Sequence, residues 1–339
     1  MRLIDYIAGL PRRLVFPWMG SAGLRLTGLA EADVLSSASQ QLLLARFMDR
    51  EYPSDFVYPL DDGALLLDAI RPVNGMLASP GGSGQGTGAT RPVPGRIPDP
   101  CRDGRIPVHL RALRLIAREF DKPLAVSVPG PFTLAAEMAG LERFLRAVRR
   151  DPSFVHEWVE FSTAAVAAYA RAALAAGARF LCISEPTAAL VSPAHFNRFV
   201  AGALRQLLTP LEAWKCLHVC GDTSHLLPCI LECGAEALSL DQVMNLPEVA
   251  QAIPPEVVLM GNLDPLGALW TGTPAAVRHE VLSLLRAMHG RPNYIVSFGC
   301  DCVPDTPPAN LKAALAAAQA VPEEYLLPSA GTERGGGNV

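Results

Sequence analysis

The sequence lacks the features of several protein classes. No stretch reaches the roughly 18 consecutive apolar residues of a membrane-spanning helix, and residues 1–18 contain no apolar run of signal-peptide length. There is no run of Lys and Arg, and the formal net charge is −4. We therefore expect a cytoplasmic protein that does not enter a membrane and does not take nucleic acid as a partner.

The chain is hydrophobic enough to build a large core. Half of its 339 residues are hydrophobic and only 18% are charged. One α/β barrel of ordinary size with an N-terminal extension accounts for this length without a second domain. The eight cysteines, in a protein expected in the cytoplasm, favour thiols or metal ligands over a disulfide framework.

Eight short apolar runs are predicted to be strands. Stretches with helical periodicity separate most of them. The runs cover residues 14–18, 56–60, 124–128, 180–184, 214–219, 237–240, 257–260 and 294–298. This alternation predicts a (β/α)8 TIM barrel with an N-terminal helical extension, and an open doubly wound sheet is the alternative.

One catalytic domain is expected over residues 1–325, followed by a disordered tail at 326–339. Residues 79–107 are rich in Gly, Pro, Ser and Arg, which predicts a long loop. In an enzyme such a loop serves as a lid, and the other interpretation is a surface insertion.

Polar and thiol side chains follow the predicted strands. In a (β/α)8 barrel the catalytic residues lie on the loops after the strands. They form a ring at one rim, contributed by strands two and four to eight. Its members are Asp61 and Asp62, Glu185, His218 with Cys220 and Asp222, Asp241, Asn262 with Asp264, and Cys300 with Cys302.

His218 and Cys220 point to the same side of an extended strand, because one residue separates them. Imidazole and thiolate are ligands that zinc prefers, and a third ligand would leave one coordination position open for substrate. Cys300, at the end of the last strand, can reach this pair across the barrel mouth, and Cys302 competes with it. Cys182, Cys216, Cys229 and Cys233 are interpreted as core residues, and Cys101 as a free thiol.

Three stretches resemble the uroporphyrinogen decarboxylase superfamily. They are Met260-Gly-Asn-Leu-Asp-Pro265, the run from Ser184 to Phe199, and the run from Gly299 to Ala313. His218-Val-Cys-Gly221, together with Gly299-Cys300 and Thr306-Pro307, is similar to the corrinoid-protein methyltransferase branch, which includes the methylcobamide:coenzyme M methyltransferases. The resemblance implies that zinc binds His218, Cys220 and Cys300, and that Cys302 is not a ligand.

The resemblance also implies a reaction. Zinc would activate an acceptor, a thiol such as coenzyme M or a folate amine, that attacks the methyl group of a methylated corrinoid. The corrinoid would arrive on a partner protein, because this chain lacks the D-x-H-x-x-G corrinoid-binding motif. Catalytic roles are expected for Glu185, Asp241 and Asp62. Cofactor contacts are expected for Asn262 and Asp264.

The sequence departs from the patterns of the superfamily in two places, and two alternative functions remain. The acidic D-x-x-x-E-A-E run of the methyltransferases corresponds here to Asp62, Leu66 and Asp68, so one glutamate is missing. The Arg-rich segment that holds substrate carboxylates in the decarboxylases is also missing, and only Arg25 lies nearby. The alternatives are tetrapyrrole decarboxylation and a non-catalytic protein that holds zinc or a corrinoid.

Overall fold

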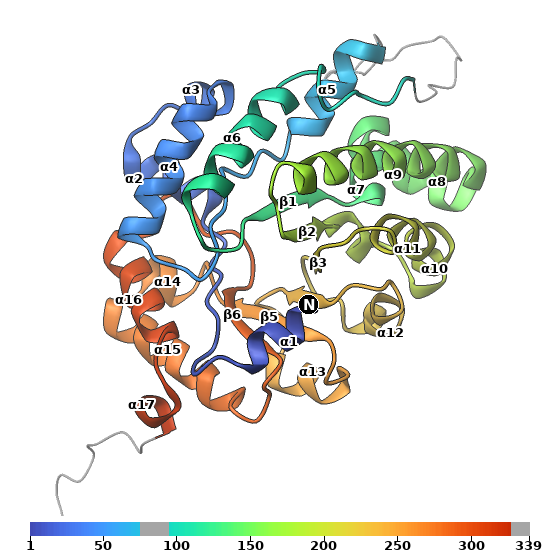
Figure 1. Ribbon diagram of the computed structural model, residues 1–339. Helices are drawn as coiled ribbons and strands as arrows, with labels where there is room; N and C mark the ends of the chain where they lie inside the picture. Colours follow the sequence, from blue (N-terminus) through green and yellow to red (C-terminus); the bar gives the residue numbers. More distant parts are fainter. Residues whose placement is uncertain (75–94, 327–339) are drawn as a thin grey trace, which may run out of the picture.

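Six parallel strands form the sheet of this protein, whose computed structural model describes residues 1–74 and 95–326 (Figure 1). Strands that are consecutive in the chain lie side by side in the sheet. The strands are β1 (Ala125–Pro129), β2 (Phe180–Ser184), β3 (Trp214–Val219), β4 (Ala237–Leu240), β5 (Val258–Leu263) and β6 (Tyr294–Phe298). Each coincides with a predicted strand to within a few residues.

The N-terminal segment closes this sheet into a barrel. Val15 forms a parallel bridge with Val296 of β6, and Val57 forms one with Leu124, next to β1. The two bridging segments are joined to each other, because the amide of Asp55 donates to the carbonyl of Val15 at 3.0 Å. Eight chain segments therefore surround the barrel axis, and the open doubly wound sheet is excluded.

The first two predicted strands, 14–18 and 56–60, are only isolated bridges. The prediction of full strands there was wrong, and proline is the physical reason. Pro17 and Pro59 interrupt the two segments, and proline has no N–H to donate to a strand ladder. The barrel is therefore regular from β1 to β6 and irregular where the N-terminal segment closes it.

Alternate residues of the strands fill the barrel interior. The first residues of β2 and β3, Phe180 and Trp214, pack there together with Cys182 and Cys216. Two residues beyond Cys182 and Cys216, the inward positions become polar. Ser184 on β2 is in register with His218 on β3, which is in register with Ser239 on β4. Side chains in a strand alternate between its two faces, so the apolar interior ends in a polar layer at the carboxyl ends of the strands.

The helices of the N-terminal region include one, α1, that covers the N-terminal end of the barrel. α1 closes the N-terminal end, since Leu3 and Ile7 join the interior cluster and Tyr6 packs on Trp214 with ring centroids 4.7 Å apart. The N-terminal helical extension was predicted. Its helices are α1 (Leu3–Ala8), α2 (Gly20–Thr27), α3 (Glu31–Ser36), α4 (Ala38–Glu51) and α5 (Leu65–Asn74).

The remaining helices surround the strands, as Figure 1 shows. They are α6 (Ile106–Glu119), α7 (Pro131–Ala139), α8 (Leu141–Arg150), α9 (Pro152–Ala175), α10 (Pro193–Phe199), α11 (Ala201–Leu208), α12 (Leu227–Leu231), α13 (Leu246–Ala252), α14 (Ala268–Thr271), α15 (Pro274–Ala287), α16 (Pro308–Ala318) and α17 (Pro322–Leu326). Most lie in predicted helical stretches, such as α9, which begins at Pro152 behind an Asp151 cap, whereas α6, α14 and α17 were not predicted. Short 3-10 helices, η1 (Pro186–Leu190) and η2 (Ser224–Leu226), follow β2 and β3.

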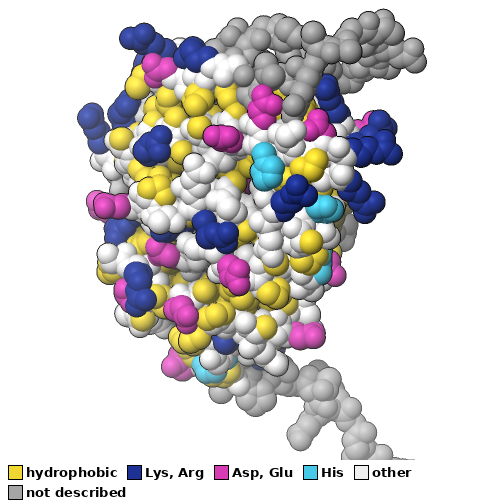
Figure 2. Space-filling view, turned by 90° about the vertical axis from the view of Figure 1, so that its right-hand side faces the viewer, with side chains coloured by type: hydrophobic (Ala, Val, Ile, Leu, Met, Phe, Trp, Pro, Cys, Tyr) yellow, Lys and Arg dark blue, Asp and Glu magenta, His cyan; other side chains and the backbone are white. Residues whose placement is uncertain are grey.

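The predicted loop and tail fall largely outside the described residues. Of the loop at 79–107, residues 95–105 contain neither helix nor strand, and α6 begins at Ile106. The tail from 327 onward is not described. Within the described ranges, none of the helices combines the length and apolarity required to traverse a bilayer. Acidic and basic side chains are interspersed over the face in Figure 2.

Candidate metal centre

His218 is the innermost residue of the centre. It lies near the end of β3 and is buried, with 6% of its surface exposed. Its Nδ1 atom lies 3.0 Å from the Ser239 hydroxyl on β4, the strand that pairs with β3 in this register. The Nε2 atom points the other way and lies 3.0 Å from the Cys220 sulfur. The imidazole is thus fixed through one nitrogen and presents the other to the barrel mouth.

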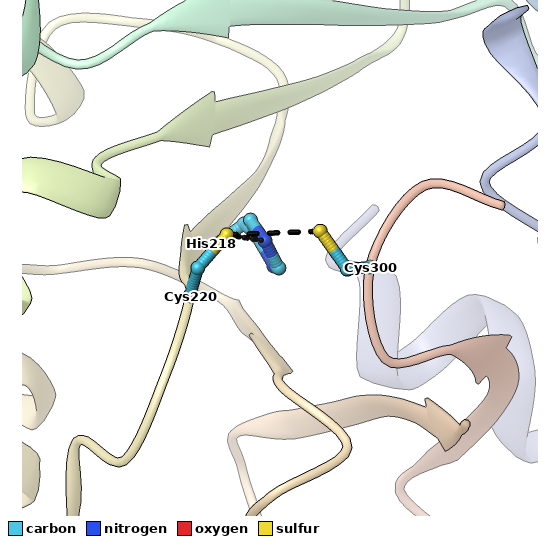
Figure 3. Close-up of side chains that lie close together, drawn as sticks. All are labelled: His218, Cys220 and Cys300. Atoms are coloured by element: carbon cyan, nitrogen blue, oxygen red, sulfur yellow. Dashed lines mark hydrogen bonds between the residues drawn. The ribbon is translucent and has the colours of Figure 1, made fainter. Parts of the chain in front are cut away.

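Cys300 completes the group from the other side of the barrel mouth (Figure 3). It follows β6, which two intervening strands separate from β3. The Cys300 sulfur lies 3.7 Å from the Cys220 sulfur, and one ligand atom from each of the three residues falls within 4.8 Å of the others. The sequence-predicted ligands His218, Cys220 and Cys300 therefore converge on one point.

Two glycines allow the loops that carry the thiols to come this close. A Cβ atom on Gly299 would lie 2.4 Å from the backbone nitrogen of Gln242, so only glycine fits before Cys300. Gly221 has a φ of +83°, a left-handed conformation, immediately after Cys220. The sequence pattern of a glycine beside each thiol thus has a steric cause.

The thiols of Cys220 and Cys300 lie close enough to affect each other's ionisation. The pKa of Cys300 is lowered, because Cys220 and then His218 hydrogen-bond to its thiolate. The pKa of Cys220 is raised, because it hydrogen-bonds to the Cys300 sulfur and is desolvated. One imidazole and two adjacent sulfurs, one of them already favoured as a thiolate, match the donor set of a zinc site with three protein ligands.

Cys302 lies outside this group. It is buried with 2% exposure among hydrophobic core residues, and its amide donates to the carbonyl of Trp18 at 3.0 Å. Burial raises its pKa, which disfavours the thiolate form that a metal requires. The other buried thiols, Cys182, Cys216, Cys229 and Cys233, are core residues as predicted, and Cys101 is exposed.

Asp241 holds the loop that carries Cys220. Its Oδ2 accepts from the amide of Gly221 at 2.8 Å, and its Oδ1 accepts from the amide of Val243 at 3.0 Å. Asn262 supports the same region, because its Nδ2 donates to the carbonyls of Asp241 and Met244 at 3.0 and 2.7 Å. Both predicted site residues thus contact backbone around the centre, and their catalytic and cofactor roles remain predictions.

Glu185 and Asp264 are also engaged with backbone. Glu185 is fully buried and accepts from the amide of Phe132 at 3.0 Å and from Thr133, so it occupies the N-terminus of α7. Burial raises its pKa to about 7. Asp264 accepts from the amide of Leu266 at 2.8 Å in the turn after β5. Their predicted catalytic and cofactor roles are untested, and neither residue lines the cavity beside the metal centre.

Asp62 forms an ion pair. Arg105 contacts Asp62 at 2.8 Å and Asp68 at 2.6 Å, and the Asp62 side chain is only 5% exposed. Two acidic positions of the run after the second bridging segment are therefore tied to the residue that precedes α6. The predicted catalytic role of Asp62 remains a prediction, and the geometry assigns it a charge partner.

A cavity of about 100 Å³ lies beside the three ligands. It adjoins a larger cavity of about 170 Å³, which extends over the N-terminal segment toward α5 and α6. The residues that line both are Trp18, Asp61, Ser127, Ser184 and Asp301. The sequence placed Asp61 in the polar ring but assigned no catalytic or binding role to any of the five, although Asp301 directly follows Cys300.

Comparisons with known proteins agree with this architecture. Residues 94–321 match the family model described as uroporphyrinogen decarboxylase. A methylated-thiol–coenzyme M methyltransferase of Methanosarcina mazei is 31% identical over 242 residues, which cover 70% of this chain and 65% of that protein. A methylcobamide:CoM methyltransferase of Methanosarcina barkeri is 28% identical over 65% of each chain. The chain thus spans slightly less than two thirds of the length of these methyltransferases.

The chain is also similar to a decarboxylase and to a protein of known structure. A uroporphyrinogen decarboxylase of Thermus thermophilus is 29% identical, over 76% of this chain and 75% of that protein. The solved structure of a methyltransferase from Methanosarcina mazei superposes with a TM-score of 0.81 at 22% identity, over 96% of this chain and 98% of that one. The superposition supports the barrel fold. On the family match, which covers most of the sequence, the chain belongs to the uroporphyrinogen decarboxylase family.

Proposed function

We propose that this protein is a zinc-dependent methyltransferase that moves a methyl group from a methylated corrinoid to a thiol. The observation that carries the proposal is the convergence of His218, Cys220 and Cys300 within 4.8 Å at the barrel mouth. The ligands would be Nε2 of His218 and the two sulfurs. A three-ligand site of this composition is the catalytic form of a zinc site, because it leaves a coordination position for substrate.

A zinc ion held there would lower the pKa of an acceptor thiol, so that the thiolate is present at neutral pH. The protein's own groups do the positioning. Ser239 fixes the His218 ring through Nδ1, and Asp241 fixes the Cys220 loop through the Gly221 amide. A rigid ligand set of this kind holds an acceptor in one place, which removes much of the entropic cost of the reaction.

The cavity beside the ligands gives the acceptor room and limits its contact with water. Cys220 and Cys300 are half-buried, and Trp18 covers His218 with ring centroids 6.3 Å apart. In the transfer a sulfur–carbon bond forms and the cobalt–carbon bond breaks. The electron pair of that bond stays on cobalt, and the thiol proton passes to solvent.

The names of similar proteins support a methylated corrinoid as the methyl donor. Two of the similar proteins carry the names of a methylated-thiol and a methylcobamide methyltransferase, both acting with coenzyme M. We propose that a corrinoid-carrying protein docks over the barrel mouth, where the carboxyl ends of the strands are open. Contacts of Asn262 and Asp264 with the corrinoid belong to this proposal, and a folate amine is the alternative acceptor.

Tetrapyrrole decarboxylation fits the cavity less well. A substrate with several carboxylates requires cationic partners, and among the described residues neither cavity is lined by Lys or Arg. The Arg105 guanidinium is already paired with Asp62 and Asp68. This lining favours a thiol substrate over an oligocarboxylate.

The test is methyl transfer from free methylcobalamin to a small neutral thiol, 2-mercaptoethanol, followed by the loss of methylcobalamin absorbance. We expect turnover by zinc-loaded protein that a chelator removes and added zinc restores. His218→Ala and Cys300→Ser should abolish turnover, whereas Cys101→Ser, which alters an exposed thiol outside the ligand group and the cavity beside it, should retain it. Zinc-independent decarboxylation of uroporphyrinogen, without methyl transfer, would contradict the proposal.

A further inference from the structure

A groove on the surface lies at the rim of the barrel mouth. Its volume is about 540 Å³, and it lies between α8 and residues 190–195, which run from the end of η1 into α10. η1 follows β2, and α7, which leads into α8, follows β1. Connections that follow the strands lie at the carboxyl end of a barrel. This α8 groove is therefore at the same end of the molecule as the metal centre, outside the cavities beside it.

Apolar side chains form one part of the lining of the α8 groove. They are Leu145 and Val148 of α8, together with Leu190 and Val191. Val148 and Val191 are buried and attach this part to the core, whereas Leu190 is 62% exposed. A single exposed leucine is ordinary, but one that adjoins further apolar side chains in a concave surface is typical of a site that another protein covers.

Basic side chains form another part of the lining. Arg146, Arg149 and Arg150 of α8 are exposed there, and His195 of α10 adds an imidazole. Arg146 pairs with Glu142, one helical turn before it. Within residues 1–74 and 95–326, Arg149 and Arg150 have no ion-pair partner. Figure 2 shows the α8 side of the molecule, and basic side chains and histidines gather toward its right-hand edge.

Two acidic residues near the groove have other partners. Glu142 is paired with Arg146, and Asp151, which follows Arg150, accepts from the amide of Phe154 at 3.1 Å as the cap of α9. The whole chain carries a formal net charge of −4, so the positive region on α8 is local. A partner with an acidic surface is attracted to this region more than to the rest of the molecule, which fixes where it docks.

The lining favours a protein segment over a nucleic acid. Among the described residues it contains no Phe, Tyr or Trp on which a base could stack. Protein interfaces combine an apolar part with a polar and charged rim, and arginine is enriched in them. The complement of this groove is a segment that carries Asp or Glu beside apolar side chains.

The α8 groove is connected to the metal centre and to the rest of the rim. Nε2 of His225 lies 3.4 Å from the carbonyl oxygen of Val191, and His225 belongs to the connection after β3 that also carries Cys220. On the other side of the mouth, the connections after β4 and β5 expose Val243 and Leu266. A partner large enough to extend from the groove over the mouth would cover these apolar residues as well.

We infer that the α8 groove binds an acidic segment, with apolar side chains, of the corrinoid-carrying protein. The inference rests on the proposed function, since it names the surface by which the methyl donor reaches the same site. The carrier is the one protein that the proposed reaction brings to the barrel mouth, and the groove lies at the rim of that mouth. A carrier held there places its corrinoid over the zinc ligands in one orientation.

The test compares a protein-bound donor with a free one. The bound donor is a corrinoid carrier with the D-x-H-x-x-G motif, encoded in the same genome and loaded with methylcobalamin, and the acceptor is 2-mercaptoethanol. Arg149→Glu with Arg150→Glu reverses the two unpaired charges of the groove. The matched control is Arg111→Glu with Arg114→Glu on α6, which makes the same change in net charge at exposed positions outside the groove.

The decisive quantity is kcat/KM with the carrier divided by kcat/KM with free methylcobalamin. Charge reversal in the groove should lower this ratio about tenfold or more, because charges at an interface rim control the rate of association. Added salt should lower the ratio for wild type and change it less for the reversed variant. Calorimetric titration of the two proteins should show the same loss in affinity. The α6 control should retain the wild-type ratio and affinity.

The apolar part of the groove has its own variant. Leu190→Ser should weaken carrier binding severalfold without changing its dependence on salt, because it removes apolar contact and leaves the charges in place. Loss of affinity in the reversed variant but none in Leu190→Ser would overturn the apolar half of the inference.

The outcomes separate the two proposals. Carrier binding that depends on Arg149 and Arg150, but with no methyl transfer to a thiol, supports the docking site and overturns the proposed reaction. Methyl transfer with the same ratio in wild type and the reversed variant overturns the docking site and leaves the reaction standing. Binding of an RNA oligonucleotide or of anionic phospholipid vesicles that is lost on reversal, while carrier binding persists, also overturns the docking site. Neither carrier binding nor transfer overturns both.

Discussion

Ser239 Oγ lies 3.0 Å from His218 Nδ1, and the two residues face each other in register on β4 and β3. This contact fixes the ring so that Nε2 is directed at the thiols. Groups that orient a metal-binding histidine in this way typically contribute about 10- to 100-fold to metal affinity. We expect Ser239→Ala to weaken zinc binding by that factor without unfolding the protein, as measured by competition with a chromogenic chelator. Unchanged affinity would show that the hydroxyl does not orient the ring.

Metal content checks the ligand set itself. Protein loaded with zinc and then dialysed should retain about one zinc per chain, as a three-ligand site requires. His218→Ala, Cys220→Ser and Cys300→Ser should each lose the metal, whereas Cys302→Ser should keep it, because Cys302 lies outside the ligand group. Elemental analysis gives the content, and circular dichroism shows which variants are folded. Zinc retained without Cys300 but lost without Cys302 would reverse the assignment of the third ligand.

Much of this centre could be predicted from the sequence. One residue separates His218 from Cys220, so both side chains were expected on one side of a strand, and Gly299-Cys300 closes the last apolar run. The six strands from β1 to β6 were identified because apolar runs of that length are buried on both faces in a parallel barrel. Local pattern therefore predicted His218, Cys220 and most of the barrel, whereas the choice of Cys300 over Cys302 as the third candidate ligand came from the family resemblance.

Contacts between distant segments could not be predicted in this way. Arg105 lies 43 positions from Asp62 in the sequence and pairs with it only through the fold. Glu185 was expected at a catalytic rim, but its carboxylate accepts the first amides of α7, which begins 54 residues earlier. Asp61 and Asp301 line the same cavities for the same reason. Sequence alone identifies a polar group at a strand end, and tertiary packing decides what it faces.

Gly299 provides a steric test of the Cys300 loop. The added Cβ of Gly299→Ala would lie 2.4 Å from the Gln242 nitrogen, so the loop must shift and carry Cys300 away from Cys220. We expect a loss of about 1–3 kcal/mol in the free energy of unfolding and a weaker zinc affinity.

The matched control for Gly299→Ala is Gly202→Ala on α11, where a Cβ meets nothing within 4 Å. This exposed helical position should gain about 0.5–1 kcal/mol of stability, because alanine loses less backbone entropy than glycine. Chemical denaturation of both variants gives the comparison. Equal stabilities for the two would mean that the Gly299 loop is free to move.

The pH dependence of stability tests the buried carboxyl of Glu185. Burial raises its pKa to about 7 in the folded protein, above the ordinary value of 4.5. The folded state therefore holds this proton more tightly than the unfolded state does. Stability from this group is greatest below pH 4.5 and is lost as the pH rises toward 7, by an amount on the order of 3 kcal/mol.

Comparison with Glu185→Gln isolates that contribution, because other groups titrate in the same range. Burial lowers the pKa of His109 to about 4, so its contribution is present above pH 6.5 and is lost as the pH falls, which is the opposite sign. His109 is unchanged in the variant and cancels in the difference. We expect the unfolding free energy of wild type minus that of Glu185→Gln to fall between pH 4.5 and 7 and to stay constant above about pH 8. A difference that rises with pH would mean that the hydrogen bonds from Phe132 and Thr133 outweigh burial and keep Glu185 ionised.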